Sequence, residues 1–180
     1  MTASKLNGFA PGAESVNRLY RNKGDRTFED VSKKARVARA GWGQGVCAGD
    51  IDNDGFVDLY VIYWARMSCI ATGNGTFEDV TPSTIGSRWG TGCAFLDYDR
   101  DGKLDLMVAN YVNFDLTNRP RPDGPKLCQW INEKVMCGPR GLKPGVNRLW
   151  HNESTPGNVR FVDVSKNAGI GTPARALAYQ

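Results

Sequence analysis

A nine-residue acidic segment occurs twice in this chain and limits what the chain can fold into. The two copies read Asp50-Ile51-Asp52-Asn53-Asp54-Gly55-Phe56-Val57-Asp58 and Asp97-Tyr98-Asp99-Arg100-Asp101-Gly102-Lys103-Leu104-Asp105. Carboxylates stand at alternate positions, a glycine follows the third of them, and a fourth carboxylate ends each copy. Like charges this close repel one another unless a cation lies between them. Two complete copies therefore favour a cation-binding loop over a solvated hairpin turn.

The oxygen-only donors of the segment predict calcium as the cation. Calcium takes about six to eight hard oxygen ligands, and a short loop that doubles back can supply them. Gly55 permits the sharp turn in the first copy. The predicted ligands are the four aspartates of each copy and one backbone carbonyl: Asp50, Asp52, Asp54, Asp58 and the Phe56 carbonyl, and Asp97, Asp99, Asp101, Asp105 and the Lys103 carbonyl. We therefore expect two calcium ions, one in each loop.

The flanks of the acidic segments exclude an EF-hand and predict strands. An EF-hand loop needs a glutamate at its twelfth position and a helix on each side, but the twelfth residues here are Val61 and Val108. The apolar runs Val46-Cys47-Ala48 and Leu59-Tyr60-Val61-Ile62-Tyr63 enclose the first segment as strands would. With 21 Gly and 9 Pro, the chain is typical of an all-β protein rich in turns.

The acidic segments belong to a longer internal repeat. Residues 42–61 align without gaps on residues 89–108, the stretch 27–31 returns at 76–80 and loosely at 160–164, and the stretch 17–20 returns at 147–150. A unit of roughly four short strands at this spacing is typical of a propeller blade.

The repeat predicts about two and a half blades, with boundaries set by its first strand. We expect a linker at 1–16, a blade with the first calcium loop at 17–64, a blade with the second loop at 65–117, an insertion at 118–146 and the start of a truncated blade at 147–180. Residues 65–72 lack the expected first strand, so we expect an irregular second blade. Because so few blades cannot close a ring, we expect a fragment, a truncated product, or a chain that takes further blades from the missing chain or another copy.

The cysteines give two different expectations. Cys128 and Cys137 enclose a predicted hairpin over Gln129–Met136, which a disulfide would staple; the alternative is two free buried thiols. The gapless alignment places Cys47 opposite Ala94, so Cys47 and Cys93 are expected on opposite faces of their strands, packed without bonding. Cys69 is expected to be free.

Composition and charge exclude two classes of partner. A net charge of +4 without a long basic run argues against nucleic-acid binding. No apolar stretch is long enough to span a membrane, and residues 1–16 lack the features of a signal peptide. The incomplete repeat favours a piece of a longer exported protein over an intracellular one.

Five segments of the chain resemble a known family. Asn17–Asn22, Gly73–Val80 and both acidic segments are similar to the FG-GAP/VCBS repeats of integrin-α-like β-propellers. The insertion around Cys128-Gln129-Trp130 and 136–142 is most similar to proteins related to cartilage acidic protein 1, which often carry an ASPIC/UnbV domain. The resemblance implies a seven-bladed propeller, calcium at the acidic loops, and an extracellular or periplasmic location.

The residues favour a non-catalytic function. The aspartates are better used as ligands than as an acid–base pair, and the single histidine, His151, takes the place of Arg21 in the repeat and reads as an ordinary strand residue. We expect a calcium-binding extracellular module for adhesion or for interaction with a protein or glycan. The alternatives are the propeller part of a secreted carbohydrate-active enzyme and a purely structural segment of a larger multidomain protein.

Overall fold

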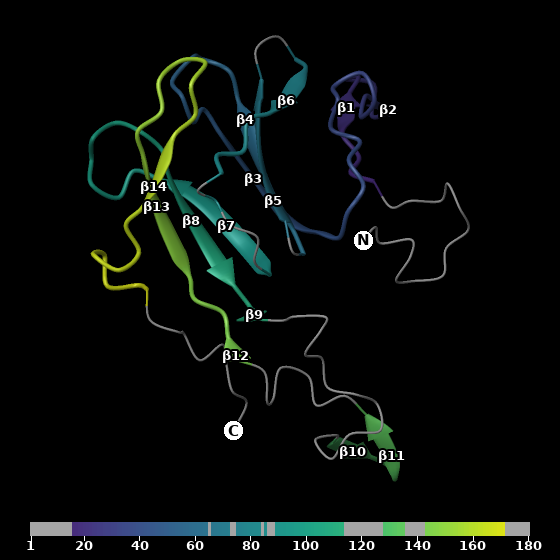
Figure 1. Cartoon of the computed structure of the whole chain (residues 1–180). Coiled ribbons are helices and arrows are strands. Elements are labelled where there is room, and N and C mark those ends of the chain that lie inside the picture. Colours follow the sequence, from purple (N-terminus) through teal and green to yellow (C-terminus); the bar gives the residue numbers. More distant parts are fainter. Residues whose placement is uncertain are drawn as a thin grey trace.

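A computed structural model describes residues 16–64, 66–72, 75–83, 85, 89–113, 128–135 and 143–171. All regular elements within these ranges are β-strands, which confirms the predicted all-β class. The described residues contain no helix with the length and apolarity needed to cross a membrane. Figure 1 shows two larger sheets lying against each other, with small hairpins beside them.

The first larger sheet is an antiparallel meander of consecutive strands. Its order is β3 (Gly43–Gly49), β4 (Asp58–Tyr63), β5 (Arg66–Thr72) and β6 (Phe77–Asp79). β5 lies where the sequence predicts no typical strand, yet it pairs with β4 from Leu59 opposite Ile70 to Tyr63 opposite Arg66. Backbone pairing with β4 is thus sufficient to form this strand without the repeat's usual side chains.

The second larger sheet has the same order but contains the insertion. Its strands are β7 (Gly90–Leu96), β8 (Asp105–Asn110), β13 (Arg148–Asn152) and β14 (Phe161–Asp163). Between β8 and β13, β9 (Val112–Asn113) pairs with β12 (Lys143–Pro144) and closes the base of the insertion. Residues 147–163, which the repeat predicts to begin a third blade, supply the outer strands of the second sheet. The boundary between sheets therefore differs from the predicted boundary between blades.

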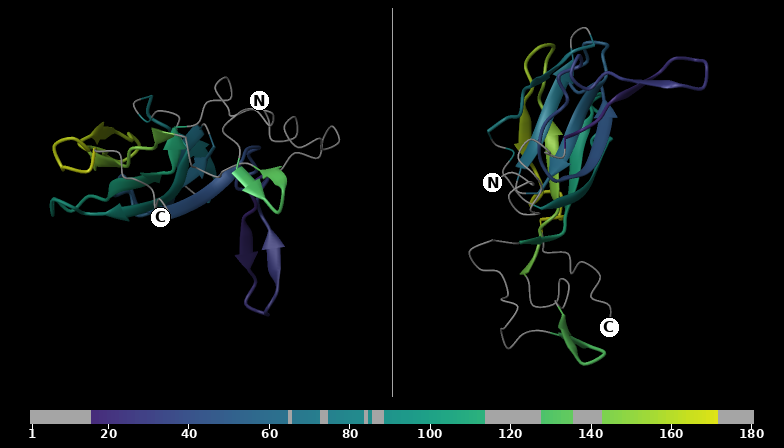
Figure 2. Two further views of the ribbon diagram at one scale, coloured as in Figure 1. Left: turned by 90° about the horizontal axis from the view of Figure 1, so that it is seen from below. Right: turned by 90° about the vertical axis from the view of Figure 1, so that its right-hand side faces the viewer.

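Two hairpins lie outside the larger sheets. β1 (Tyr20–Asn22) and β2 (Phe28–Asp30) pair only with each other among the described strands and project from the body of the molecule (Figure 2). β10 (Cys128–Trp130) and β11 (Glu133–Val135) form the predicted insertion hairpin, whose two turn residues have the positive φ of a type I′ turn. Cys137 lies outside the described residues, so the predicted Cys128–Cys137 bond remains a prediction.

The main hydrophobic core lies between the two larger sheets. Alternate β4 residues Tyr60 and Ile62 are fully buried in it, and from the second sheet so are Leu106 and Val108. The opposite face of β4 carries Val61, which belongs to a smaller cluster. This period of two lets one strand contribute to both faces of its sheet. The sheets therefore stack face to face, as propeller blades do.

A disulfide between Cys47 and Cys93 joins these stacked sheets, and the expectation that the two cysteines only pack is wrong. Their Cα atoms lie 5.9 Å apart. Cys47 pairs with Tyr60 and Cys93 with Val108, so each cysteine shares a face with a core residue. The alignment correctly places the cysteines on opposite faces of their own sheets. Those opposite faces meet when two similar sheets stack in the same orientation.

Strands β2, β6 and β14 each end in an aspartate that binds the Ser or Thr two residues later, an arrangement that we call an aspartate corner. In the second sheet, Asp163 accepts hydrogen bonds from the backbone N–H (3.0 Å) and the hydroxyl of the buried Ser165 and pairs with Arg148 at 2.7 Å. Burial raises the pKa of Asp163, but the hydrogen bonds from Ser165 and the nearby guanidinium outweigh this effect and lower the pKa below its ordinary value. Asp30 and Asp79 make equivalent bonds, and their pKa values are lowered too.

Removing the disulfide should lower the stability of the folded protein. The bond closes a loop with a sequence separation of 46 residues. For such a loop the chain-entropy model gives about 3–4 kcal/mol of stabilisation. We expect Cys93→Ser to lower the free energy of unfolding in urea by about this amount. Under reducing conditions, wild-type protein and the variant should have the same free energy of unfolding. Titration of all five cysteines as free thiols in denatured, unreduced protein would contradict the bond.

The aspartate corners predict how stability depends on pH. A carboxylate whose pKa is lowered by folding stabilises the protein above its unfolded pKa of about 3.9, and this contribution is lost as the pH falls through the folded value. We expect the free energy of unfolding of wild-type protein to decrease more steeply between pH 5 and pH 3 than that of Asp163→Asn, measured by urea denaturation. Parallel slopes for the two proteins would refute the role of this corner.

Candidate metal centre

The two acidic segments form equivalent loops at the same edge of the stacked sheets. The first connects β3 to β4, and the second connects β7 to β8. β3 lies so close to the second sheet that a Cβ added to Gly49 would be 2.8 Å from the Leu104 side chain. This close approach brings the two loops together. Asn53 Nδ2 lies 3.5 Å from the Gly102 carbonyl oxygen across the gap between the loops.

The carboxylates hold each loop in shape by accepting backbone hydrogen bonds. Asp50 accepts from the N–H groups of Asp54 (3.1 Å) and Gly55 (2.9 Å), as Asp97 does from those of Asp101 and Gly102, both at 3.1 Å. Gly55 and Gly102 have φ values of 89° and 85°, which residues with a Cβ atom rarely adopt. The sequence repeat is thus also a repeat of backbone conformation.

Each loop brings three of its predicted ligands together. One oxygen from each of Asp50, Asp52 and Asp58 lies within 4.8 Å of the others, and the same holds for Asp97, Asp99 and Asp105. The closing aspartates are buried, with Asp58 1% exposed and Asp105 fully covered. Carboxylates held this close in a partly buried site repel one another, and a bound cation would offset that repulsion.

Asp52 provides the strongest test of whether a cation fits. The residue is 4% exposed, and its Oδ2 accepts a 2.7 Å hydrogen bond from the Gly157 N–H. Its Oδ1 is buried and has no hydrogen-bond partner in the part of the chain that the structure describes. A buried carboxylate oxygen without a partner is costly, whereas a ligand oxygen has its partner in the metal. The oxygen donors of this loop therefore fit the calcium predicted from the sequence.

The remaining predicted ligands lie in the loops but outside these two clusters. Asp54 accepts from the Phe56 N–H and Asp101 from the Lys103 N–H, each at 2.8 Å. Asp101 instead groups with Asp99 and His151. The Phe56 and Lys103 carbonyls remain predicted ligands. The Lys103 side chain donates to the Ser154 carbonyl at 3.0 Å, so it turns away to the connection between β13 and β14.

Asn152 ties both loops to β13, a role that the sequence pattern does not predict. The residue is fully buried, and its side-chain amide donates to the carbonyls of Ile51 (2.7 Å) and Leu104 (2.8 Å). Its backbone N–H donates to Asp105 Oδ1 at 2.8 Å. Asn22 holds the corresponding place in the first copy of the repeat, and this recurrence is the signal that could have identified the position.

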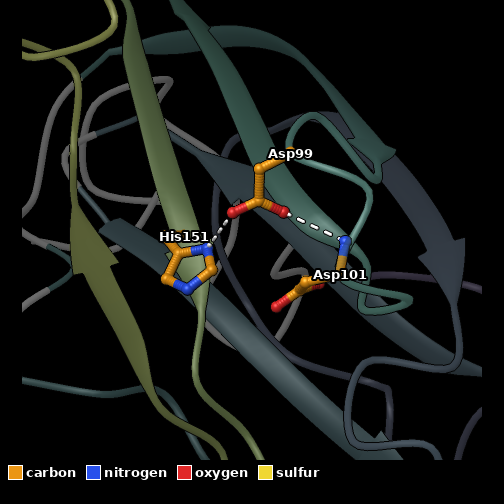
Figure 3. A group of neighbouring side chains, drawn as sticks. All are labelled: Asp99, Asp101 and His151. Atoms are coloured by element: carbon orange, nitrogen blue, oxygen red, sulfur yellow. Dashed lines mark hydrogen bonds and ion pairs between the residues drawn. The ribbon is translucent and has the colours of Figure 1, made fainter.

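His151 is a strand residue of β13, as predicted, but its side chain also lies beside the second loop. Its Nδ1 is 3.2 Å from Asp99 Oδ2 and 3.2 Å from Asp105 Oδ1. Figure 3 shows the imidazole directed at Asp99, with Asp101 on the same side. The sequence gives no sign of this proximity because β13 is separated from the loop by the whole insertion.

Replacing Asn152 should destabilise the protein more than replacing its equivalent in the repeat. Asn152→Ala leaves the Ile51 and Leu104 carbonyls and the Ser154 N–H without their partner. We expect a loss of about 2–4 kcal/mol in the free energy of unfolding in urea. The matched control is Asn22→Ala, which removes one exposed bond to the Gly24 N–H and should cost about 1 kcal/mol or less. Equal losses in the two variants would contradict the bridging role.

The comparison with protein families accords with this geometry. No curated protein sequence matches the chain significantly. The family model of the FG-GAP-like repeat matches residues 9–61 and 67–108, which together make up more than half of the chain and include both acidic loops. The chain therefore belongs to the family of FG-GAP-like repeat proteins.

Proposed function

We propose that this chain is a calcium-binding, non-catalytic β-propeller module that acts in adhesion or in binding a protein or glycan. Its two acidic loops each hold one calcium ion. The first loop uses Asp50, Asp52, Asp54, Asp58 and the Phe56 carbonyl, and the second uses the equivalent residues from Asp97 to Asp105. When bound, calcium neutralises the clustered carboxylates and fixes the turn between the two innermost strands of each blade.

The observation that carries the proposal is the unpartnered oxygen of Asp52. Asp52 Oδ1 is buried beside Asp50 and Asp58, and no donor among the described residues offsets its loss of hydration. A structural turn would satisfy that oxygen with a backbone N–H, as it does for Oδ2. A cation accounts for both the burial and the missing donor.

The Cys47–Cys93 bond supports an extracellular or periplasmic location, because disulfides persist mainly in oxidising compartments. This agrees with the finer resemblance of the insertion to proteins related to cartilage acidic protein 1 and to the ASPIC/UnbV family. We propose membership of that subfamily on the sequence around Cys128 and Cys137.

The face of the first sheet turned away from the second supports further blades as partners. The groove there has a volume of about 370 Å³ and is lined by Leu19, Val37, Leu59 and Val61, among others. Val46 is 61% exposed on this face, at the position that Cys93 occupies in the second sheet. Because Cys93 faces the core between the sheets, we propose that Val46 faces a preceding blade.

Calcium should stabilise the folded protein measurably. At a calcium concentration of about ten times the dissociation constant, each site contributes roughly 1.4 kcal/mol. For two sites in a chain of this size, we expect chelation to lower the melting temperature by roughly 5–10 °C. Asp52→Asn should lose about half of this response, measured by differential scanning calorimetry with calcium and with chelator.

A matched control removes a carboxylate outside the loops. Glu78 lies in β6, and its side chain is 75% exposed. The variant Glu78→Gln should therefore keep the full calcium response. Equal melting of folded wild-type protein with and without chelator, together with no heat of calcium binding in titration calorimetry, would refute the proposed function.

A further inference from the structure

The second acidic loop differs from the first in having an imidazole beside it. His151 Nδ1 lies 3.2 Å from one oxygen of Asp99 and 3.2 Å from one oxygen of the buried Asp105. The ligand atoms of Asp99, Asp101 and His151 all lie within 4.8 Å of one another. Figure 3 shows these three side chains converging from β13 and from the loop between β7 and β8.

The ring nitrogen lies at ion-pair distance from two carboxylates, where a ligand to a shared cation would also lie. The Nδ1 atom is buried, and neither nearby carboxylate meets it with the geometry of a hydrogen bond. The Tyr98 ring contacts the imidazole edge-on, with centroids 6.2 Å apart and an interplanar angle of 88°, which fixes the ring's orientation. The side chain as a whole is 24% exposed, so the centre can exchange ions with solvent.

The first loop has no such nitrogen at the equivalent position. In the second sheet Trp150 pairs with Leu106, and in the first sheet Ile70 pairs with Leu59. Leu59 and Leu106 are equivalent residues of the repeat, so the position that follows Trp150 in β13 corresponds to Ala71 in β5. Alanine offers no ligand atom, and the first loop keeps oxygen donors alone.

We propose that His151 completes a mixed imidazole–carboxylate centre in the second loop, at which a first-row transition-metal dication such as Zn²⁺ displaces the Ca²⁺ that this loop otherwise holds. The ligands are His151 Nδ1 with the carboxylates of Asp99, Asp101 and Asp105. Imidazole nitrogen suits zinc and similar ions, whereas calcium prefers oxygen throughout. The proposal rests on the proposed metal-binding function of the loops and adds that Zn²⁺ competes with Ca²⁺ in the second loop but not in the first.

The single histidine of the chain allows a direct test. Protein without an affinity tag, labelled with ¹⁵N only in histidine, gives one pair of ring-nitrogen signals, both from His151. We expect Zn²⁺, titrated at constant pH in the presence of millimolar Ca²⁺, to shift the Nδ1 signal to that of a metal-bound nitrogen and to saturate at one equivalent. An Nδ1 signal that stays unchanged at saturating Zn²⁺, or returns in excess Ca²⁺, would overturn the proposal. Zinc bound to cysteines elsewhere would not produce this shift.

Variants separate the centre from the calcium function. His151→Ala should lower the affinity for Zn²⁺ at least tenfold, and Asp99→Asn should abolish the Nδ1 shift. Glu78→Gln, with its exposed carboxylate in β6, should leave the shift unchanged. In uniformly ¹⁵N-labelled samples of the same proteins, the amide signal of Gly55 reports calcium binding to the first loop. If Gly55 responds to Ca²⁺ and His151 does not respond to Zn²⁺, this inference alone fails; if His151 responds and Gly55 does not, the calcium function fails.

Discussion

The arrangement of this site depends on the hydrogen bonds that the side-chain amide of Asn152 donates. Its two hydrogens bind carbonyls from two different acidic loops, Ile51 in one and Leu104 in the other. Because the residue belongs to β13, a strand of the second sheet, these bonds fix the loops to each other and to the core between the sheets. A change in the shape of one loop must therefore strain a bond to the other.

The same sequence repeat serves two purposes in this chain because burial differs between its copies. The side chains of Asn22 and Asn152 both accept a hydrogen bond from the N–H group two residues later. The donors are Gly24 and Ser154, each at 2.8 Å. Only Asn152 is covered by a neighbouring sheet, and only there does the amide gain inter-sheet partners. The repeat therefore specifies local geometry, and stacking decides which of its polar groups become structural bridges.

Local features of the fold could be predicted from the sequence, whereas contacts between sheets could not. The acidic loops, their flanking strands and the insertion hairpin follow from short-range patterns of charge, alternation and turn residues. The Cys47–Cys93 bond and the position of His151 depend on which faces meet. A repeat alignment shows which positions of the two sheets are equivalent. It does not show which faces of the two sheets contact each other. The alignment also could not reveal that β5 forms by backbone pairing, since backbone pairing leaves little trace in side chains.

The burial of Asn152 also limits how this chain can be produced. Asn152-Glu153-Ser154 is an acceptor triplet for N-linked glycosylation, yet both hydrogens of this amide are engaged and the residue is fully covered. In a eukaryotic secretory host, oligosaccharide transfer at this asparagine can succeed only before the strand docks. A sugar chain found there would thus mark polypeptide that was modified before it folded.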